Sequence, residues 1–176
     1  TSTQIDVAFE IFRAPNCPAL SEALAKIWKV YAVIWTTTPW TIPVNQALAY
    51  SPSSKYVILS LGGSNHNYLV AADLADQFCA RFYAANPNEH LEPVCEPFDG
   101  AELQGAVAGH PMDHLGGFFA RPRPFLPGDF VTTDSGTGLV HMSPDHGEDD
   151  FDLCNANGID PVFAVEGDGK YRADWL

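Results

Sequence analysis

The chain has 176 residues, of which 46% are hydrophobic and 18% are charged, and its formal net charge is −13. This composition excludes a disordered chain, and no apolar run reaches the roughly 18 residues that a membrane span requires. The strong acidity excludes broad binding to a phosphate backbone, because that mode needs a surface of lysine and arginine. We therefore expect one globular domain over residues 1–176, in which any nucleic-acid contact is limited to a few nucleotides.

The N-terminus and the cysteines indicate the setting of this domain. The chain begins with Thr1 instead of methionine and shows no signal peptide, which predicts a fragment of a longer protein. None of the four cysteines forms a CxxC pair, so we expect reduced thiols, with a disulfide or a zinc site as the alternative. We expect a cytoplasmic protein without membrane contact, and an organellar matrix is the alternative location.

The first half of the chain alternates between strand and helix patterns. Apolar residues at every second position predict a strand over Ile5–Ile11, and a helix follows over Ser21–Lys29 with Ser21 as its cap. β-Branched and aromatic residues predict strands over Val30–Thr37 and Tyr56–Leu61. Apolar residues spaced four apart predict the longest helix over Ala71–Phe82.

The second half contains many short apolar segments between prolines and glycines. They predict a helix over Glu148–Asn157, ended by Gly158, and four short strands: Leu103–Val107, Phe118–Arg121, Phe130–Thr133 and Leu139–Met142. Fourteen prolines, fourteen glycines and only two or three helices are typical of a β-rich α+β domain. We expect a barrel or closed sheet with flanking helices.

A first polar motif lies at Trp35–Thr41, where three threonines follow an apolar strand and precede a proline. On an extended backbone Thr36 and Thr38 face the same side and Thr37 faces the other. Two hydroxyls on one side suit a bound water or the oxygens of a ribose or an ester, since each hydroxyl donates and accepts. The alternative is that threonine stands here only because it favours strands.

A second motif runs from Gly136 to Asp150 and gathers several titratable side chains. Its purely structural interpretation is a partly buried histidine at 141 and acidic residues that stabilise the start of a helix. A metal site is an alternative, although proline and glycine interrupt the spacing of its five candidate ligands: His141, Asp145, His146, Asp149 and Asp150. A serine triad has less support, since no G-x-S-x-G elbow is present. A further use of Asp150 is to bind an ammonium group.

These two motifs resemble the editing domain of the isoleucyl-tRNA synthetases, a family of class I aminoacyl-tRNA synthetases. The resemblance lies in the segments YAVIWTTTPWTIPVNQALAY and GTGLVHMSPDHGEDDF. The editing relatives on valyl- and leucyl-tRNA synthetases carry an arginine and an acidic residue where this chain has Thr38 and Trp40. The resemblance implies a compact β-barrel-like domain with flanking helices (CP1). The ATP-handling signatures of the parent enzymes are absent, so no cofactor is expected in this domain; the full enzyme would use ATP and Mg.

The resemblance also implies a function and a set of site residues. The function is post-transfer editing, the deacylation of valine from tRNA(Ile), with pre-transfer hydrolysis of valyl-adenylate left open. The implied partners are the tRNA 3′ end, the valyl-adenosine moiety and the rest of the synthetase. The implied catalytic residues are Thr36, Thr37, Thr38, His141 and Asp150. The implied substrate-binding and supporting residues are Trp35, Asn45, Gly138 and Asp149.

The chemistry of the residues limits the mechanism. One methylene in an apolar pocket gives only about 1–3 kcal/mol of discrimination, a magnitude for which the isoleucine enzymes are themselves the standard example. A second, hydrolytic site is therefore needed to remove valine. Because a threonine nucleophile needs an adjacent base, we expect attack by a bound water that Thr36 or Thr38 orients. The competing hypotheses are a metal-dependent hydrolase and a non-catalytic module that only binds the aminoacylated tRNA end.

Overall fold

The computed structural model describes residues 3–175, which form ten β-strands, three α-helices and five 3-10 helices. The strands are β1 (Ile5–Arg13), β2 (Lys29–Thr36), β3 (Ala47–Tyr50), β4 (Lys55–Leu61), β5 (His66–Ala71), β6 (Leu91–Pro93), β7 (Phe98–Asp99), β8 (Val107–Ala108), β9 (Arg123–Pro127) and β10 (Leu139–Met142). The helices are α1 (Pro18–Ala25), α2 (Ala75–Ala85) and α3 (Glu148–Ala156). The 3-10 helices are η1 (Pro39–Val44), η2 (Ala72–Leu74), η3 (Gly100–Leu103), η4 (Asp113–Leu115) and η5 (Gly117–Ala120).

The strands form one mixed sheet in the order β10-β3-β9-β8-β1-β2-β5-β4-β6, and β7 also pairs with β4. This confirms the α+β prediction. The sheet is not closed: β10 lies beside β2, but no ladder joins the two in residues 3–175. The expected barrel is therefore only approximate, because the curved sheet brings its β10 edge against β2 without hydrogen-bonding it there.

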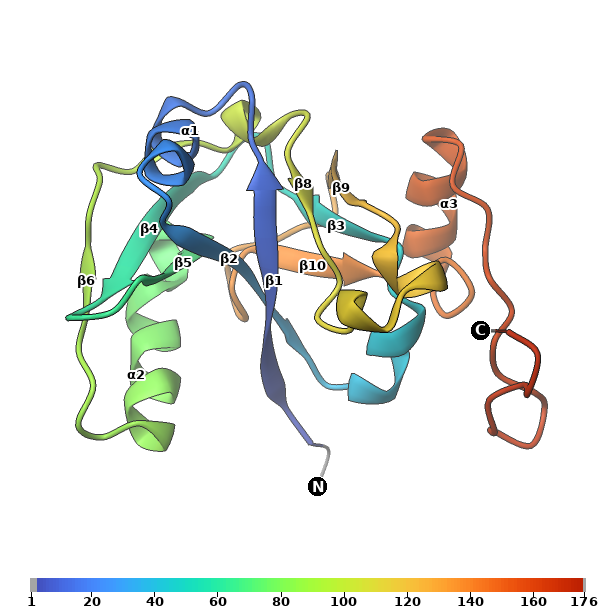
Figure 1. The fold of residues 1–176 in the computed structure, drawn as a ribbon. Helices are drawn as coiled ribbons and strands as arrows, with labels where there is room; N and C mark the ends of the chain where they lie inside the picture. Colours follow the sequence, from blue (N-terminus) through green and yellow to red (C-terminus); the bar gives the residue numbers. More distant parts are fainter. Residues whose placement is uncertain (1–2, 176) are drawn as a thin grey trace.

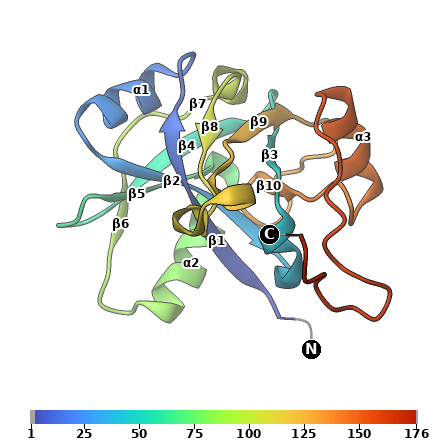
Figure 2. The same cartoon turned by 45° about the vertical axis from the view of Figure 1, so that its right-hand side comes forward.

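Three apolar clusters hold the sheet and helices together. The largest lies inside the curve of the sheet and includes Phe9, Ile34 and Leu69. A second cluster packs α2 onto the outer face of β4 and β5 through Phe78, and a third packs α3 against β3 through Cys154. Figure 1 shows α2 and α3 at opposite ends of the sheet, with β1 between them. Figure 2 shows the C-terminal segment running down beside α3.

The register of two strand pairs positions the polar motifs. In the antiparallel pair β1–β2, Asp6 lies opposite Trp35 and the ladder ends where Ile5 meets Thr36. In the antiparallel pair β3–β10, Leu48 lies opposite His141. The two motifs, which are about one hundred residues apart in the sequence, therefore meet where β10 passes β2.

Both predicted helices in the first half are displaced from their expected bounds. The first begins at Pro18, and proline at the first helical position is favoured because that N–H needs no partner. Ser21 is not the cap; its hydroxyl donates to Ala14 O at 2.7 Å. The second helix begins at Ala75, not Ala71, because Ala71 still pairs with Tyr56 in the sheet and donates to Thr137 O.

Three of the short predicted strands are wrong. Residues 100–103 form η3, which a capping box of Asp99 and Glu102 stabilises, so that the strand begins only at Val107. Residues 117–120 form η5 instead of a strand, after two glycines with positive φ. Residues 130–133 form no strand: the bond from Val131 N to Gly128 O closes a turn over residues 128–131, and the chain is irregular after it. Each segment is apolar, but side-chain caps and turns satisfy its backbone locally.

The predicted elements β1, β2, β4, β10 and α3 are confirmed, whereas strands β3, β5, β6, β7 and β9 were not predicted. All four residues of β3 are buried, so it lacks the alternation that marks a strand with one exposed face. Strand β5 follows the turn after β4, and its antiparallel pairing with β4 makes a hairpin. It also pairs in parallel with β2, which places it in the middle of the sheet.

Candidate active site

Thr36 and Thr38 lie where β2 ends and η1 begins. Their hydroxyl oxygens are 3.3 Å apart, and Thr36 Oγ1 accepts a hydrogen bond of 3.0 Å from the Thr38 amide. Thr36 is 7% exposed, and its partner hydroxyl on Thr38 lies nearer the solvent. The two threonines thus turn to the same side of the chain and form a pair of hydroxyls at the edge of the core.

A chain of hydrogen bonds fixes the ring of His141 on β10. Thr41 Oγ1 lies 2.8 Å from His141 Nε2, and Asn45 Nδ2 lies 3.3 Å from His141 Nδ1. The Thr41 hydroxyl donates its only proton to Thr38 O at 2.8 Å, so it can only accept at Nε2. We infer from this network that Nε2 carries the ring proton and that Nδ1 accepts from Asn45. In this tautomer both ring nitrogens are occupied.

The protonation state of His141 follows from its burial. Desolvation, together with smaller contributions from the nearby His110 and His146, lowers the pKa of His141 to about 4. The ring is therefore neutral near pH 7 and serves as a fixed, uncharged wall. It contacts Thr41, not the hydroxyls of Thr36 or Thr38, so in the described residues neither of these hydroxyls has a histidine as its base.

Asp150 lies in the first turn of α3, which begins after Gly147. Its Oδ2 accepts a hydrogen bond of 2.8 Å from the amide of Ser143. Burial raises the pKa of Asp150, and the Ser143 amide opposes that effect. Among residues 3–175 no lysine or arginine forms an ion pair with this carboxylate. Asp150 thus presents a half-buried acceptor that has no cation beside it.

These groups line one small pocket of about 270 Å³. The side chain of Trp40 contacts the ring of His146 at its rim, with ring centroids 5.1 Å apart in an edge-to-face arrangement. The pocket combines hydroxyls, a carboxylate, a neutral histidine and indole rings. Its lining residues are Trp35, Thr36, Thr38, Trp40, Thr41, Val140, His141, Ser143, His146 and Asp150.

A neighbouring pocket of about 220 Å³ shares Trp35 and Val140 with the first and is lined by the glycine-rich turn at 136–138. Gly138 has a φ of 79°, and a Cβ built there would lie 2.3 Å from the Cβ of Ala71. Glycine is therefore required at 138 both for its backbone conformation and for the close approach to β5.

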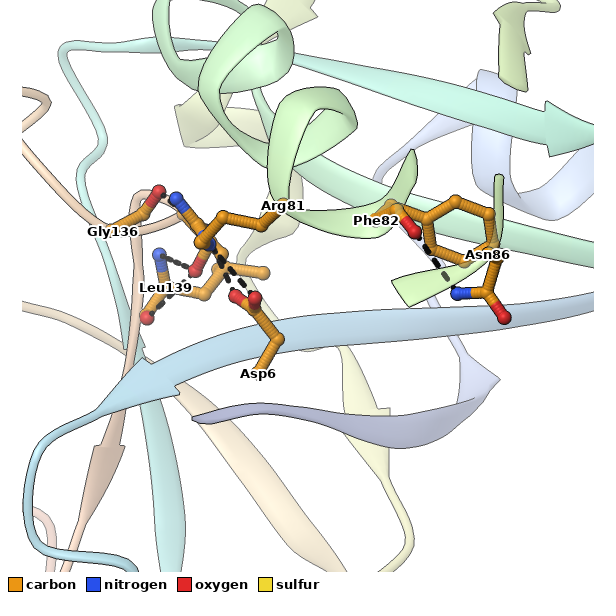
Figure 3. A network of polar contacts seen from close by, with 7 residues as sticks. Asp6, Arg81, Phe82, Asn86, Gly136 and Leu139 are labelled. Carbon is orange, nitrogen blue, oxygen red and sulfur yellow. Dashed lines mark hydrogen bonds and ion pairs between the residues drawn. The ribbon is translucent and has the colours of Figure 1, made fainter. Parts of the chain in front are cut away.

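A clamp holds this turn in place. Figure 3 shows Arg81 extending from α2 to Asp6 on β1 and to the carbonyl of Gly136. The guanidinium makes two bonds of 2.8 Å to the carboxylate of Asp6 and one of 3.3 Å to Gly136 O. The planar fork of arginine suits such a bidentate contact, and it ties the turn to two other elements.

The positions of the predicted site residues differ. Trp35, Thr36, Thr38, His141 and Asp150 line the first pocket, and Gly138 lines the second. The other three lie outside both pockets: Thr37 and Asp149 are exposed, and Asn45 is buried behind His141. Sequence reasoning assigned no role to Thr41, Ser143 or Val140. Thr41 stands three residues after Thr38 in a helical turn, and that spacing is a signal for a shared face.

Two further observations concern metals and membranes. In residues 3–175 no group of three or more histidine, cysteine, aspartate or glutamate side chains comes close enough to hold a metal ion. The five candidate ligands of the second motif therefore do not form a metal-binding group, since Asp149 turns to solvent and His141 is held by Thr41 and Asn45. Within the same residues no helix combines the length and the apolar character that a membrane crossing needs.

Curated proteins with similar sequences are isoleucine–tRNA ligases. The chain is 53% identical over 175 residues to the ligase of Zymomonas mobilis and 45% identical over 183 residues to that of Gluconobacter oxydans. Each alignment covers 99% of this chain but only 17% or 18% of the relative, so the chain corresponds to less than a fifth of those proteins. No family model matches the chain.

Solved structures with a similar fold are editing domains of leucyl-tRNA synthetases. The crystal structure of GlLeuRS-CP1 superposes with a TM-score of 0.64 over 90% of this chain and 65% of that one, at 18% identity. The cytosolic leucyl-tRNA synthetase editing domain of P. falciparum gives a TM-score of 0.59 over 89% and 68%, at 12% identity. At such low identities these likenesses show the fold alone. Taken with its sequence relatives, the chain belongs to the isoleucine–tRNA ligase family, as a segment with the editing-domain fold.

Proposed function

We propose that this segment hydrolyses the ester bond between valine and the terminal adenosine of tRNA(Ile), which is post-transfer editing. The observation that carries the proposal is the pocket in which Thr36, Thr38, His141 and Asp150 converge. The names of the relatives, which are isoleucine–tRNA ligases, and the editing-domain fold support it. The proposed partners are the 3′ end of the tRNA and the rest of the synthetase.

Asp150 is the proposed binding site for the α-ammonium group of valine. Its Oδ2 is already bonded to the Ser143 amide, so the other carboxylate oxygen is left to accept from a ligand. A half-buried carboxylate without a cation is electrostatically unfavourable, and an ammonium group would compensate it through a charge-assisted hydrogen bond. The free carboxylate of Asp150 therefore favours an ester that carries an α-ammonium group over an ester without one.

His141 is proposed to limit the length of the side chain that enters. Its ring is fixed on both nitrogens by Thr41 and Asn45, so it cannot turn aside for a larger ligand. A fixed wall can exclude isoleucine sterically while admitting valine, which a pocket that merely attracts apolar groups cannot do well. Asn45 then acts as a positioning residue, since it touches the histidine and not the pocket.

Thr36 and Thr38 are proposed to hold the attacking water. The water oxygen bonds to the ester carbonyl carbon, and the bond from that carbon to the ribose oxygen breaks. The water gives up a proton, and the released ribose oxygen takes one up to become a hydroxyl. Each threonine hydroxyl can donate to or accept from the water, which fixes its distance from the carbonyl. A threonine nucleophile has less support, because His141 is bonded to Thr41 instead.

The adenosine is proposed to extend into the neighbouring pocket. A volume of about 270 Å³ is small for an aminoacylated nucleoside, given that ligand pockets span roughly 300–1,000 Å³. The adjoining pocket of about 220 Å³ shares Trp35 with the first and offers the backbone of the 136–138 turn. Gly138 would then contribute to substrate binding through the shape of that turn.

No cofactor is proposed for this reaction. A metal-dependent hydrolase is the alternative that a chelator distinguishes: treatment with EDTA should leave ester hydrolysis unchanged. Loss of activity in EDTA, with recovery when a divalent metal is added, would instead support the metal-dependent reaction. A non-catalytic binding module would bind valyl-adenosine without releasing valine.

The decisive variants are three aspartates of α3 changed to asparagine. We expect Asp150→Asn to reduce hydrolysis of a valyl-adenosine ester by about thirtyfold or more, because a buried charge-assisted bond is worth roughly 2–5 kcal/mol. Asp152→Asn is the matched control: it removes an exposed charge from the same helix and should have no effect. Asp149→Asn decides between the resemblance, which makes Asp149 a supporting residue, and the geometry, which leaves it in solvent. Equal rates for Asp150→Asn and Asp152→Asn would refute the proposed role of Asp150.

A further inference from the structure

A larger cavity, of about 580 Å³, lies away from the proposed active site. Residues from the turn after η5 form one wall, and the segment that follows α3 forms the other. Gln46 forms part of its lining, and it directly follows Asn45, the residue that holds His141. The two sites therefore meet at adjacent residues of the chain.

Arg123 in this cavity is a buried cation without an acidic partner. Its side chain is 1% exposed, and in residues 3–175 it forms no ion pair. The guanidinium donates to the carbonyls of Arg121 and Phe118 and lies 4.8 Å from the centre of the Phe118 ring. Its Nε has no hydrogen-bond partner. Neutral carbonyls and a ring face only partly compensate a buried positive charge.

Arg121 adds a second positive charge to the same cavity. It is exposed, and its guanidinium lies 5.5 Å from the centre of the same Phe118 ring. The chain has only nine lysines and arginines and a net charge of −13. Two of those nine cations are thus concentrated in one cavity of an otherwise strongly acidic protein, which marks the cavity for an anion.

Gln46 presents a hydrogen-bond acceptor to the ligand, in contrast to the donors of the two arginines. Its Nε2 donates to Asp160 O at 2.9 Å, which fixes the orientation of the amide. Its Oε1 is buried without a hydrogen-bond partner. A ligand that satisfies the cavity must therefore carry a negative group for the arginines and a hydrogen-bond donor for the amide oxygen.

We propose that this cavity binds one nucleotide of a single-stranded RNA, with its phosphate at Arg121 and Arg123 and its ribose 2′-hydroxyl donating to Gln46 Oε1. Arginine binds phosphate in bidentate fashion, and the 2′-hydroxyl is the donor that distinguishes RNA from DNA. A volume of about 580 Å³ suits a nucleotide better than a free phosphate ion. That the strand belongs to tRNA rests on the proposed editing function; the nucleotide site does not.

One lining residue, Asp160, carries the same charge as the proposed phosphate, so its replacement tests whether affinity rises or falls. Asp160 is exposed at the edge of the cavity, where its carboxylate repels a phosphate. Asp160→Asn removes this repulsion but keeps the backbone carbonyl that Gln46 needs. It should therefore strengthen binding, whereas a cavity that receives a basic peptide would lose affinity.

The test is titration of the 176-residue chain with two short single strands of the same sequence, one of RNA and one of DNA. We expect the RNA strand to bind more tightly, and we expect Arg121→Gln to weaken both strands roughly three- to tenfold at low salt. For the Arg121→Gln variant, the slope of the logarithm of the binding constant against the logarithm of the salt concentration should be smaller in magnitude by about 0.7. This is the change expected when one phosphate contact on a single strand is lost. Gln46→Met should remove the preference for RNA.

Arg13→Gln is the control, since it removes an exposed arginine on β1 outside the cavity and should change neither affinity nor slope. Arg121 is exposed, so its replacement leaves the core intact, whereas Arg123→Gln could fail to fold. Absent RNA binding, or equal losses from Arg121→Gln and Arg13→Gln, would overturn the proposal. Ester hydrolysis of valyl-adenosine by the unaltered chain is measured separately. If the chain binds RNA through Arg121 but does not hydrolyse the ester, only the editing function is refuted. If it hydrolyses the ester but does not bind RNA, only the nucleotide site is refuted.

Discussion

The two ends of the sheet are stabilised in different ways. At the α2 end, β2, β4 and β5 are covered on both faces, and the packing around Phe78 is almost wholly apolar. At the α3 end, polar side chains are buried among the apolar ones. These are Thr41, Asn45, His110, Arg123, Thr137, His141 and Ser143. The α2 end therefore depends mainly on apolar burial, and the α3 end depends also on hydrogen bonds between buried polar side chains.

This difference separates stability from function. Buried polar side chains are few at the α2 end, where Asn67 on β5 is one, because such a group needs partners that apolar packing does not supply. The α3 end satisfies most of its polar groups with short strands, 3-10 turns and side-chain bonds, and hydroxyls and a carboxylate are left to line the first pocket. We expect substitutions at the α2 end to change the free energy of unfolding and those at the α3 end to change ligand selection as well.

The largest expected effect on stability is at the α2 end. Phe78, which is 3% exposed, packs between α2 and the sheet. We expect Phe78→Ala to lower the free energy of unfolding by about 3–5 kcal/mol through lost burial and the cavity left behind. Urea unfolding measures the change. Phe12→Ala, at a half-exposed ring on β1, is the control and should cost far less. A large loss of substrate selectivity in the folded Phe78 variant would contradict the separation.

An effect that is smaller for each residue involved is expected from acid, and it should arise at the α3 end. Burial lowers the pKa values of His110 and His141 to about 4. Below about pH 6.5 the unfolded chain takes up protons that the folded chain does not, so stability falls as the pH drops from about 6.5 to 4. The loss should be at most about 3 kcal/mol for each histidine at pH 4.

Urea unfolding at pH 7 and at pH 4.5 measures this loss. Replacing buried His110 by asparagine should reduce the difference between the two pH values, whereas replacing exposed His114 should not. The buried carboxylate of Asp150 acts with the opposite sign, since its raised pKa means that protonation relieves an unfavourable charge in the fold. An unchanged pH dependence in the His110 variant would refute the assignment.

The smallest effect on stability should come with the clearest effect on selectivity. Thr41→Val leaves His141 Nε2 without an acceptor, at a cost of about 1–3 kcal/mol. Thr38 O loses the hydroxyl bond but keeps the bond of 3.0 Å from the amide of residue 41. The loosened ring should then admit a longer side chain, so that isoleucyl-adenosine is hydrolysed faster relative to valyl-adenosine. Thr37→Val, at an exposed threonine, is the comparison. The wall hypothesis fails if both variants keep the original ratio.

The same contrast explains which elements the sequence predicted. Strand β1 follows from its alternating pattern, and strands β2 and β4 follow from their runs of β-branched and aromatic residues, because each run is long. The start of α2 was misplaced because Ala71 is held in the sheet by Thr137, a residue far along the chain. Segments such as η5 were misassigned, since apolar residues bounded by glycine look alike in a turn and in a strand.

Site residues were predictable where several polar residues stand together in the sequence. They were not predictable where one isolated side chain contacts the site from a distant segment. The hydroxyl pair of Thr36 and Thr38 follows from the alternation of a strand, and their shared side agrees with that expectation. The role of Thr41 depends on a bond to a residue one hundred positions away, which no local pattern encodes. Arg123 resembled any other polar residue until the fold buried it beside Phe118.

The clamp of Arg81 has a consequence for the order of folding. It joins three segments near residues 6, 81 and 136, so it cannot form until α2 has docked and the chain has closed two long loops. Loop closure delays contacts between distant residues, and the turn at 136–138 has few local bonds to hold it earlier. We therefore expect the hairpin of β4 and β5 to form before the pocket, and amide exchange in a refolding chain should protect Leu69 sooner than Leu139.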